Sequence, residues 1–411
     1  MKNNIKKEFI WNSLGSGLTS FCSLFFLIIA NKINGINIAG TFNFCYATIC
    51  IFYCIAVYCG RTYQVTETDK NISNNDYIKS RIITTLLMLF ITIVFAVINR
   101  YDFIKFSIFI ILALMKIIEA ISDVYHGILQ KNNRLDIVGK SLFIRSILDI
   151  LVFFIIEYFT KNIILASLSM VIISLIIFIF IDKKNANKYI IAEKYSKSSI
   201  IKIFRYGFFA FAFTFIANYL VNAPRYAIDS LMSSKFQTIF GIIVMPASII
   251  MLINQLIIQP LIMKLKNYYK NKDKNSFVKI ILILCIITTI IGVFSMIIAY
   301  FIGIPILNLL YGIDLTAYKT NLIIVLVGAT LYTLSTILSN ALIVLRKTKV
   351  QMIFYATSFI FAIGISYYLV DLYKFNGAIY SYILIMLLLF IMYLIYFIAI
   401  IYSKKVWSDK K

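Results

Sequence analysis

The sequence contains little charge. Of its 411 residues only 14% are charged, whereas 61% are hydrophobic, and the mean hydropathy is +0.91. A water-soluble domain of this size could not bury so much apolar surface. The composition therefore excludes a soluble globular protein and indicates that lipid is the solvent for most of the chain.

Acidic residues are scarcer still, with 17 Asp and Glu against 40 Lys and Arg, which gives a formal net charge of +23. A chain this basic could bind nucleic acid, but such binding needs basic side chains on a soluble fold. Here they lie in short stretches between apolar segments. We therefore expect no nucleic-acid partner and interpret the positive charge as a determinant of membrane topology.

Residues typical of metal sites and nucleotide hydrolysis are also rare. The sequence has one histidine and no GxxxxGK[ST] phosphate loop, which argues against a multi-histidine metal site and against ATP hydrolysis by that route. Four of the six cysteines fall in one apolar segment, where a helix would spread them around its circumference. We expect no metal, no cofactor and no catalytic residue. The cysteines are Cys22, Cys45, Cys50, Cys54, Cys59 and Cys285.

Long apolar segments are abundant. A membrane-spanning helix needs about 20 mostly apolar residues, and twelve segments meet this requirement. Lipid offers no hydrogen-bond partner to the backbone, so each segment should be a helix, and the fold class is an all-α polytopic membrane protein. The segments are residues 10–31, 41–60, 82–99, 106–128, 141–159, 163–181, 204–222, 237–260, 280–302, 321–345, 350–370 and 378–402.

The distribution of Lys and Arg predicts the orientation of these helices. With a cytoplasmic N-terminus, Lys and Arg in the cytoplasmic segments outnumber those in the outer loops by roughly four to one. This asymmetry predicts that both termini are cytoplasmic. No outer loop is long enough to form a catalytic domain, so we do not expect an enzyme.

The widest polar interruption between apolar segments in the middle of the chain runs from Asp182 to Arg205, "DKKNANKYIIAEKYSKSSIIKIFR". It separates six predicted helices from six others. We therefore predict an N-terminal lobe at residues 1–182, a cytoplasmic linker at 183–203 and a C-terminal lobe at 204–411. Two six-helix bundles are an arrangement that transporters use to rock around a central site.

One predicted helix carries a polar stripe, in the stretch "MKIIEAISDVYHGILQ". At 100° per residue Lys116, Glu119, Asp123 and His126 share an arc of about 80°. Lys116 should lie about 15 Å deep in the membrane, near its midplane. Because an isolated charge there costs at least about 2.5 kcal/mol, the stripe should face protein or a water-filled cavity.

Two interpretations of this stripe remain open. It could be a structural ion pair between Lys116 and Glu119, with Asp123 and His126 simply reaching the interface. It could instead be a cavity wall in which Lys116 binds an anionic substrate, while Glu119 and Asp123 couple transport to an ion gradient by sharing a proton. The depth of Lys116 favours the second interpretation, whereas the position of His126 needs no special explanation.

Further polar residues lie at the ends of predicted helices. Arg61 follows the second segment at its cytoplasmic end, and Asn218, Asn222 and Arg225 lie at the outer end of the seventh. A guanidinium group suits diphosphate oxygens, so the two arginines could bind a phosphate group on either side of the membrane. Arg61 could equally be an ordinary positive-inside anchor.

Several blocks of the sequence resemble the Wzx-type polysaccharide flippases of the multidrug/oligosaccharidyl-lipid/polysaccharide exporter superfamily. The resemblance covers nearly the whole chain and is strongest in five blocks. They are "NSLGSGLTSFCSLFFLIIANKINGINIAGTFNF", "YCGRTYQVTETD", "KIIEAISDVYHGILQKNNRLDIVGKS", "NAPRYAIDSLMSSKFQTIFGIIVMPASII" and "LLYGIDLTAYK".

The resemblance implies a carrier in the bacterial cytoplasmic membrane. Such carriers move an undecaprenyl-diphosphate-linked oligosaccharide from the inner to the outer leaflet by alternating access around a cationic cavity, for capsule, exopolysaccharide or O-antigen synthesis. Membrane lipids, a polysaccharide polymerase and glycosyltransferases are the expected partners. The substrate-binding residues would be Lys116, Arg61, Arg225, Asn218 and Asn222.

Two other classes of function remain. The first is an ion-coupled multidrug or cation antiporter of the same superfamily, which would need a cavity dominated by carboxylates. The stripe contains charges of both signs. The second is a polymerase or ligase acting on the outer face, which would need a long arginine-bearing outer loop. The sequence has no such loop.

Overall fold

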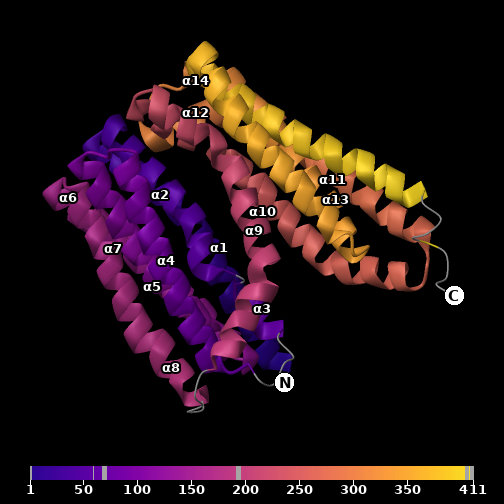
Figure 1. Ribbon diagram of the computed structural model, residues 1–411. Helices are drawn as coiled ribbons and strands as arrows, with labels where there is room; N and C mark the ends of the chain where they lie inside the picture. The colour runs from indigo at the N-terminus through magenta and orange to yellow at the C-terminus, as the bar shows by residue number, and fades with distance from the viewer. Residues whose placement is uncertain (1, 59, 67–71, 191–195, 403–406, 408–411) are drawn as a thin grey trace. The chain divides into compact units, whose positions relative to one another are not determined.

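The computed structural model describes residues 2–58, 60–66, 72–190, 196–402 and 407, which are helical almost throughout and contain no strand (Figure 1). Cys59 and part of the predicted linker, residues 191–195, lie outside the described residues. The helices form two compact units, Met1–Phe215 and Ile216–Lys411. The predicted all-α class with two helical bundles is confirmed.

The first unit is a bundle of long helices followed by short elements. The long helix α9, Lys197–Leu231, begins in this unit and ends in the second. The other elements are α1 (Lys2–Asn34), α2 (Ile36–Val57), α3 (Gly60–Thr66), α4 (Asn74–Ile98), α5 (Phe103–Lys131), α6 (Leu135–Thr160), α7 (Ile163–Ile177), a π-helix (Phe178–Lys183), α8 (Lys184–Ala186) and a 3₁₀ turn (Asn187–Tyr189).

The second unit is built from the end of α9 and the helices that follow. A π-helical turn joins α11 directly to α12. The elements are α10 (Ser234–Lys270), α11 (Lys274–Ile298), the π-helix (Ala299–Gly303), α12 (Ile304–Tyr311), a 3₁₀ turn (Thr316–Tyr318), α13 (Lys319–Val344) and α14 (Thr348–Tyr402).

Each of the twelve predicted segments overlaps a helix. Within the part of the chain that the structure describes, nine helices are long and apolar enough to cross a membrane by length and composition. The 55-residue helix α14 contains two of the predicted segments and breaks at Lys374, whose φ is 51° and ψ is −126°. The charged helices α5 and α6 are not among the nine, because their ionisable side chains lower their apolar character. The chain is a multi-pass membrane protein.

Helices α1 and α6 of the first unit approach each other closely at two glycines. A Cβ atom added to Gly15 would collide with the carbonyl oxygen of Gly139, and one added to Gly139 would collide with the backbone of Trp11 and Asn12. Only glycine allows two helix backbones to pack this closely. The two glycines therefore fix the wall of the unit from which α1 and α6 contribute side chains to the site.

Aromatic rings of α1, α2 and α6 pack together beside this wall. Phe26 of α1 packs against Phe42 of α2 and Phe153 of α6, with ring centroids 6.4 and 5.1 Å away, and also against Tyr46 at 5.9 Å. Phe26, Phe42 and Phe153 are all buried. Offset and edge-on aromatic packing of this kind gives a rigid apolar layer at one end of a polar cavity.

Candidate functional site

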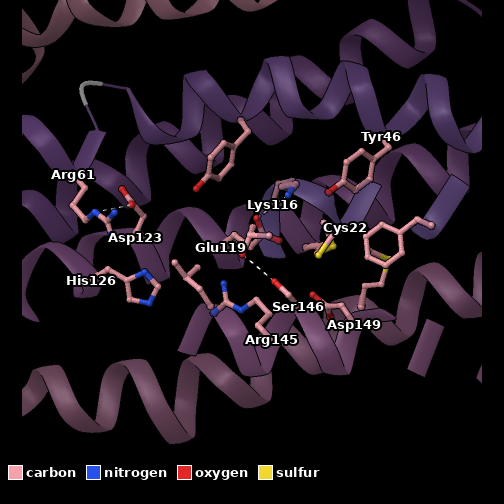
Figure 2. A pocket seen from close by; sticks show the side chains of 16 residues that line it. Cys22, Tyr46, Arg61, Lys116, Glu119, Asp123, His126, Arg145, Ser146 and Asp149 are labelled. Carbon is pink, nitrogen blue, oxygen red and sulfur yellow. Dashed lines mark hydrogen bonds and ion pairs between the residues drawn. The ribbon is translucent and has the colours of Figure 1, made fainter. Parts of the chain in front are cut away.

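The first unit encloses a polar cavity of about 230 Å³ (Figure 2). Six helices contribute to its wall, namely α1, α2, α3, α5, α6 and α7. The lining residues are Thr19, Cys22, Phe26, Tyr46, Tyr53, Arg61, Met115, Lys116, Glu119, Asp123, His126, Leu142, Arg145, Ser146, Asp149 and Met170. The whole predicted stripe of α5 faces this one cavity.

Lys116 is buried in the cavity wall with 8% of its surface exposed. Its Nζ atom lies 2.8 Å from Oε2 of Glu119, one turn further along α5 (Figure 2). The same ammonium group lies 5.2 Å from the ring centroid of Tyr46 and 5.7 Å from that of Tyr53, both on α2. One carboxylate and two aromatic rings therefore stabilise a positive charge that would be unfavourable in contact with lipid.

Asp123 is shared by two arginines. Nη2 of Arg81, on α4, lies 3.5 Å from Oδ2, whereas Nε of Arg61, on α3, lies 4.0 Å from Oδ1. Arg81 also donates a hydrogen bond to the carbonyl of Ala56 at 3.2 Å and is almost fully buried, while 26% of the Arg61 side chain is exposed. Arg81 is thus the fixed partner of Asp123, and Arg61 is the partner that can exchange.

His126 is buried in the first unit and has a specific partner. Only 3% of it is exposed, and Nε2 lies 2.9 Å from Oδ1 of Asp182. Asp182, on the π-helix after α7, is completely buried and also accepts hydrogen bonds from Ser141 and, at 2.9 Å, from Nη2 of Arg145. Ordinary helical spacing does not predict the π-helical turn that carries this carboxylate.

Helix α6 supplies two charged side chains that the sequence analysis missed. Arg145 lines the cavity and donates to Ser122 of α5 at 3.0 Å as well as to Asp182. Asp149 lines the cavity one turn further along α6, with 5% of its surface exposed. Among the described residues, Oδ1 of Asp149 has no hydrogen-bond partner. The i,i+4 spacing of two charges inside a predicted membrane helix was the signal that could have identified them.

The charges that line the cavity balance. Three cations, Arg61, Lys116 and Arg145, face the carboxylates of Glu119, Asp123 and Asp149. The resemblance implies a cationic cavity, whereas the described lining of this cavity in the first unit carries equal numbers of cationic and anionic side chains. The difference comes from Asp149, whose negative charge has no matching cation in hydrogen-bond contact within the described part of the chain.

The remaining predicted site residues belong to the second unit. Asn222 donates a hydrogen bond to the carbonyl of Asn218 at 2.9 Å, one turn back on α9. Arg225 is buried with its guanidinium carbon 5.2 Å from the ring centroid of Phe240, and its backbone carbonyl accepts a hydrogen bond from Gln237 at 2.6 Å. None of the three lines the cavity of the first unit.

No family model matches the chain. The sequence is 27% identical over 326 residues to the "Capsular polysaccharide biosynthesis protein CapF" of Staphylococcus aureus, which covers 78% of this chain and 80% of that protein.

Solved structures match over nearly the full length of the chain. An inward-facing multidrug resistance MATE transporter of the MOP superfamily has a TM-score of 0.68 at 13% identity, covering 96% of both chains. A eukaryotic MATE transporter has a TM-score of 0.64 at 10% identity, covering 98% of both, and a Vibrio cholerae MATE transporter has 0.62 at 12%, covering 99% of both. The chain therefore has the fold of the MATE transporters of the MOP superfamily.

Proposed function

We propose that this protein is a transporter that moves an undecaprenyl-diphosphate-linked oligosaccharide from the cytoplasmic to the outer leaflet of a bacterial cytoplasmic membrane. The observation that carries the proposal is the buried, ion-paired Lys116 in the polar cavity of a membrane-embedded helical unit. The transporter fold and the likeness to a capsular polysaccharide biosynthesis protein support it. Capsule synthesis is accordingly the favoured process.

The proposed mechanism is an exchange of ion-pair partners. A diphosphate that enters the cavity offers several anionic oxygens, which compete with Glu119 for the Lys116 ammonium group. Arg61 is the second group available for this exchange, because Arg81 continues to hold Asp123 when Arg61 leaves. The sugars remain in polar surroundings, and no hydrolysis step is required.

Ion coupling is assigned in this proposal to the carboxylates that lose their cations. When the diphosphate takes Lys116 and Arg61, Glu119 loses its ion-pair partner and Asp123 keeps only Arg81, so that a proton or a sodium ion can bind to these carboxylates. Asp149 joins them, because its carboxylate faces the same cavity and Oδ1 has no hydrogen-bond partner among the described residues. Asn218, Asn222 and Arg225 are proposed to contact substrate from the second unit. The polysaccharide polymerase and the glycosyltransferases are proposed to act after and before this step.

The experiment is complementation of a deletion strain, with surface polysaccharide and lipid-linked repeat units on the inner leaflet as the two readouts. Lys116→Ala should leave the protein in the membrane at normal abundance, abolish surface polysaccharide and cause inner-leaflet repeat units to accumulate. Lys116→Arg should keep part of the activity because it retains the cation. Full surface polysaccharide with Lys116→Ala would contradict the proposal.

A cation antiporter is the second candidate, and the specific observation in its favour is the balanced cavity with the carboxylate of Asp149. The two functions differ in what the deletion strain loses. An antiporter mutant would become sensitive to toxic cations and keep its surface polysaccharide, whereas a mutant of the lipid-linked carrier would show the opposite pattern.

A further inference from the structure

A second cleft, far along the sequence from the polar cavity, lies on the second unit where α11 begins and α14 ends. Its volume is about 340 Å³. The lining residues are Lys274, Asn275, Val278, Lys279, Leu282, Ile283, Ile401 and Tyr402. It therefore combines two ammonium groups, an amide and a phenol with a set of aliphatic side chains.

The helix α11 presents two different faces at this position. Phe277, Ile281 and Leu284 point into the unit and are buried. Leu282 and Ile283 point away from it and are 56% and 43% exposed, and Lys279 is exposed beside them. Helical spacing continues the exposed side through Ile286 and Ile290, which gives an apolar stripe directly below a lysine.

The polar end of the cleft is positively charged. Among its described lining residues none is acidic. Lys274 lies with Nζ 5.0 Å from the ring centroid of Tyr402. Asp273, the preceding residue, caps α11 by accepting a hydrogen bond from the Ser276 amide at 3.0 Å, so its carboxylate is engaged with the helix itself. Among the described residues, no acidic side chain of the cleft neutralises the two lysines, so their charge suits an external anion.

Aromatic side chains gather at this end of the unit, and such residues are typical of the level of the lipid headgroups. Trp407 packs with its ring 5.5 Å from that of Phe277 and 6.0 Å from that of Tyr269, while Tyr402 is largely exposed at the cleft. Tyrosine and tryptophan gather where membrane meets water, and lysines beside them bind phosphate groups of anionic lipids.

We propose that the cleft between α11 and the end of α14 binds an anionic phospholipid of the membrane. The phosphodiester lies between Lys274 and Lys279, within reach of Asn275, and an acyl chain follows Val278, Leu282 and Ile283. Both halves of the lipid match the cleft, because the charge is complementary at one end and the surface is apolar at the other. The site is separate from the transported substrate and does not depend on the proposed function.

The protein contains its own reporter for this proposal. The sequence has two tryptophans, so Trp11→Phe leaves Trp407 as the single emitter, packed on Phe277 at the start of α11, the helix that lines the cleft. The full chain is reconstituted in vesicles of phosphatidylcholine with a minor fraction of phosphatidylglycerol. Bromine, a contact quencher, is placed on the acyl chains of one lipid or the other. Brominated phosphatidylglycerol should quench the fluorescence of Trp407 more strongly than its mole fraction in the vesicles predicts.

Charge removal then tests the two lysines. Lys274→Gln with Lys279→Gln should lower the preference for the anionic lipid by about 30-fold, given roughly 1 kcal/mol for each lysine at a membrane surface. Lys264→Gln with Lys266→Gln removes the same charge from exposed positions on α10 that do not line the cleft, and should leave the preference unchanged. Lys274→Arg with Lys279→Arg should retain it.

Three results would overturn the proposal. Quenching that follows the lipid composition in the parent protein would show that the cleft has no preference. If the cleft variant and the α10 control lost the preference for the anionic lipid equally, the preference would come from overall charge and not from the cleft. Displacement by potassium phosphate at constant ionic strength would assign the cleft to a free anion, whereas a bound lipid should stay in place.

Discussion

At the scale of single residues, the site depends on which carboxylates have partners. Asp182 and Asp149 are both buried, yet Asp182 binds His126, Ser141 and Arg145, whereas Oδ1 of Asp149 has no hydrogen-bond partner among the described residues. A buried charge is retained at low cost only when it is paired. The two aspartates should therefore respond in opposite ways to neutralisation.

We expect Asp182→Asn to destabilise the protein by about 3 kcal/mol, because it leaves Arg145 and His126 without their anion. Asp149→Asn removes a charge with no ion pair to lose and should leave the thermal midpoint unchanged or raise it. Thermal unfolding in one detergent measures both variants, and Arg145→Lys serves as a milder control. A larger loss for Asp149→Asn than for Asp182→Asn would contradict this account.

The same neutralisation tests coupling. If Asp149 takes part in ion binding, Asp149→Asn should keep the fold and abolish the dependence of transport on an imposed proton or sodium gradient. Proteoliposomes with and without each gradient measure this directly. A variant that keeps the full gradient response would remove Asp149 from the coupling group and leave Glu119 and Asp123.

Sequence reasoning predicted part of this residue pattern and missed the rest for a physical reason. Helical periodicity alone places Lys116, Glu119, Asp123 and His126 on one face, and all four line the cavity. Arg81 and Asp182 lie near the ends of apolar segments, where charges usually mark topology. Only tertiary packing shows that these two are buried beneath the cavity wall.

At the scale of helices, the positions of the predicted segments agree with the structure, while breaks and π-turns were not predicted. The length of an apolar segment is a local property that can be read directly from the sequence. The break of α14 at Lys374 brings Gly377 close to the preceding turn, where an added Cβ would collide with the carbonyl of Leu369. Contacts of that kind depend on pairs of residues and produce no periodic pattern in the sequence.

The contact between α1 and α6 gives a prediction for one glycine. Gly139→Ala should lower the yield of folded protein or its thermal midpoint substantially, because the added methyl group meets the rigid backbone of Trp11 and Asn12. Gly17→Ala is the matched control on α1, since no atom lies within 4 Å of a Cβ atom built there. Size-exclusion chromatography and thermal unfolding compare them. Equal stability of the two variants would mean that the helices are not in contact at Gly139.

The start of α11 gives a prediction for pH. Hydrogen bonds from Ser276 hold the pKa of Asp273 below its ordinary value. A carboxyl group with a lowered pKa stabilises the fold above its unfolded pKa, and this contribution is lost as the pH falls through the folded value, here below about pH 4. The thermal midpoint of Asp273→Asn should fall less over this window, because asparagine caps a helix without titrating. Parallel pH curves would contradict the assignment.

At the scale of the whole molecule, α9 runs unbroken from Lys197 to Leu231 and contributes to both units, whose division falls between Phe215 and Ile216. The predicted lobes at 1–182 and 204–411 and the predicted cytoplasmic linker at 183–203 stay predictions. Composition identified the widest polar stretch. It does not reveal that the first turns of α9, the helix that follows this stretch, pack with the first unit.

The orientation of the termini is tested by labelling from outside. In a variant without the native cysteines, Lys161→Cys and Lys374→Cys should react with a membrane-impermeant maleimide in intact cells, because the positive-inside rule places them outside. Lys183→Cys and Lys347→Cys should react only after the cells are opened. The reverse pattern would invert the topology and exchange the two faces in the proposed mechanism.

The glycine contact between α1 and α6 has a consequence for how the chain is made. α1 is synthesised first, yet α6, its partner in this glycine contact, begins at Leu135. At common translation rates the ribosome needs on the order of ten seconds to produce the intervening stretch. Throughout that time the polar edge of α1 at Thr19 lacks its Ser146 partner. We therefore expect the insertion machinery to retain the first helix until the fifth predicted segment arrives.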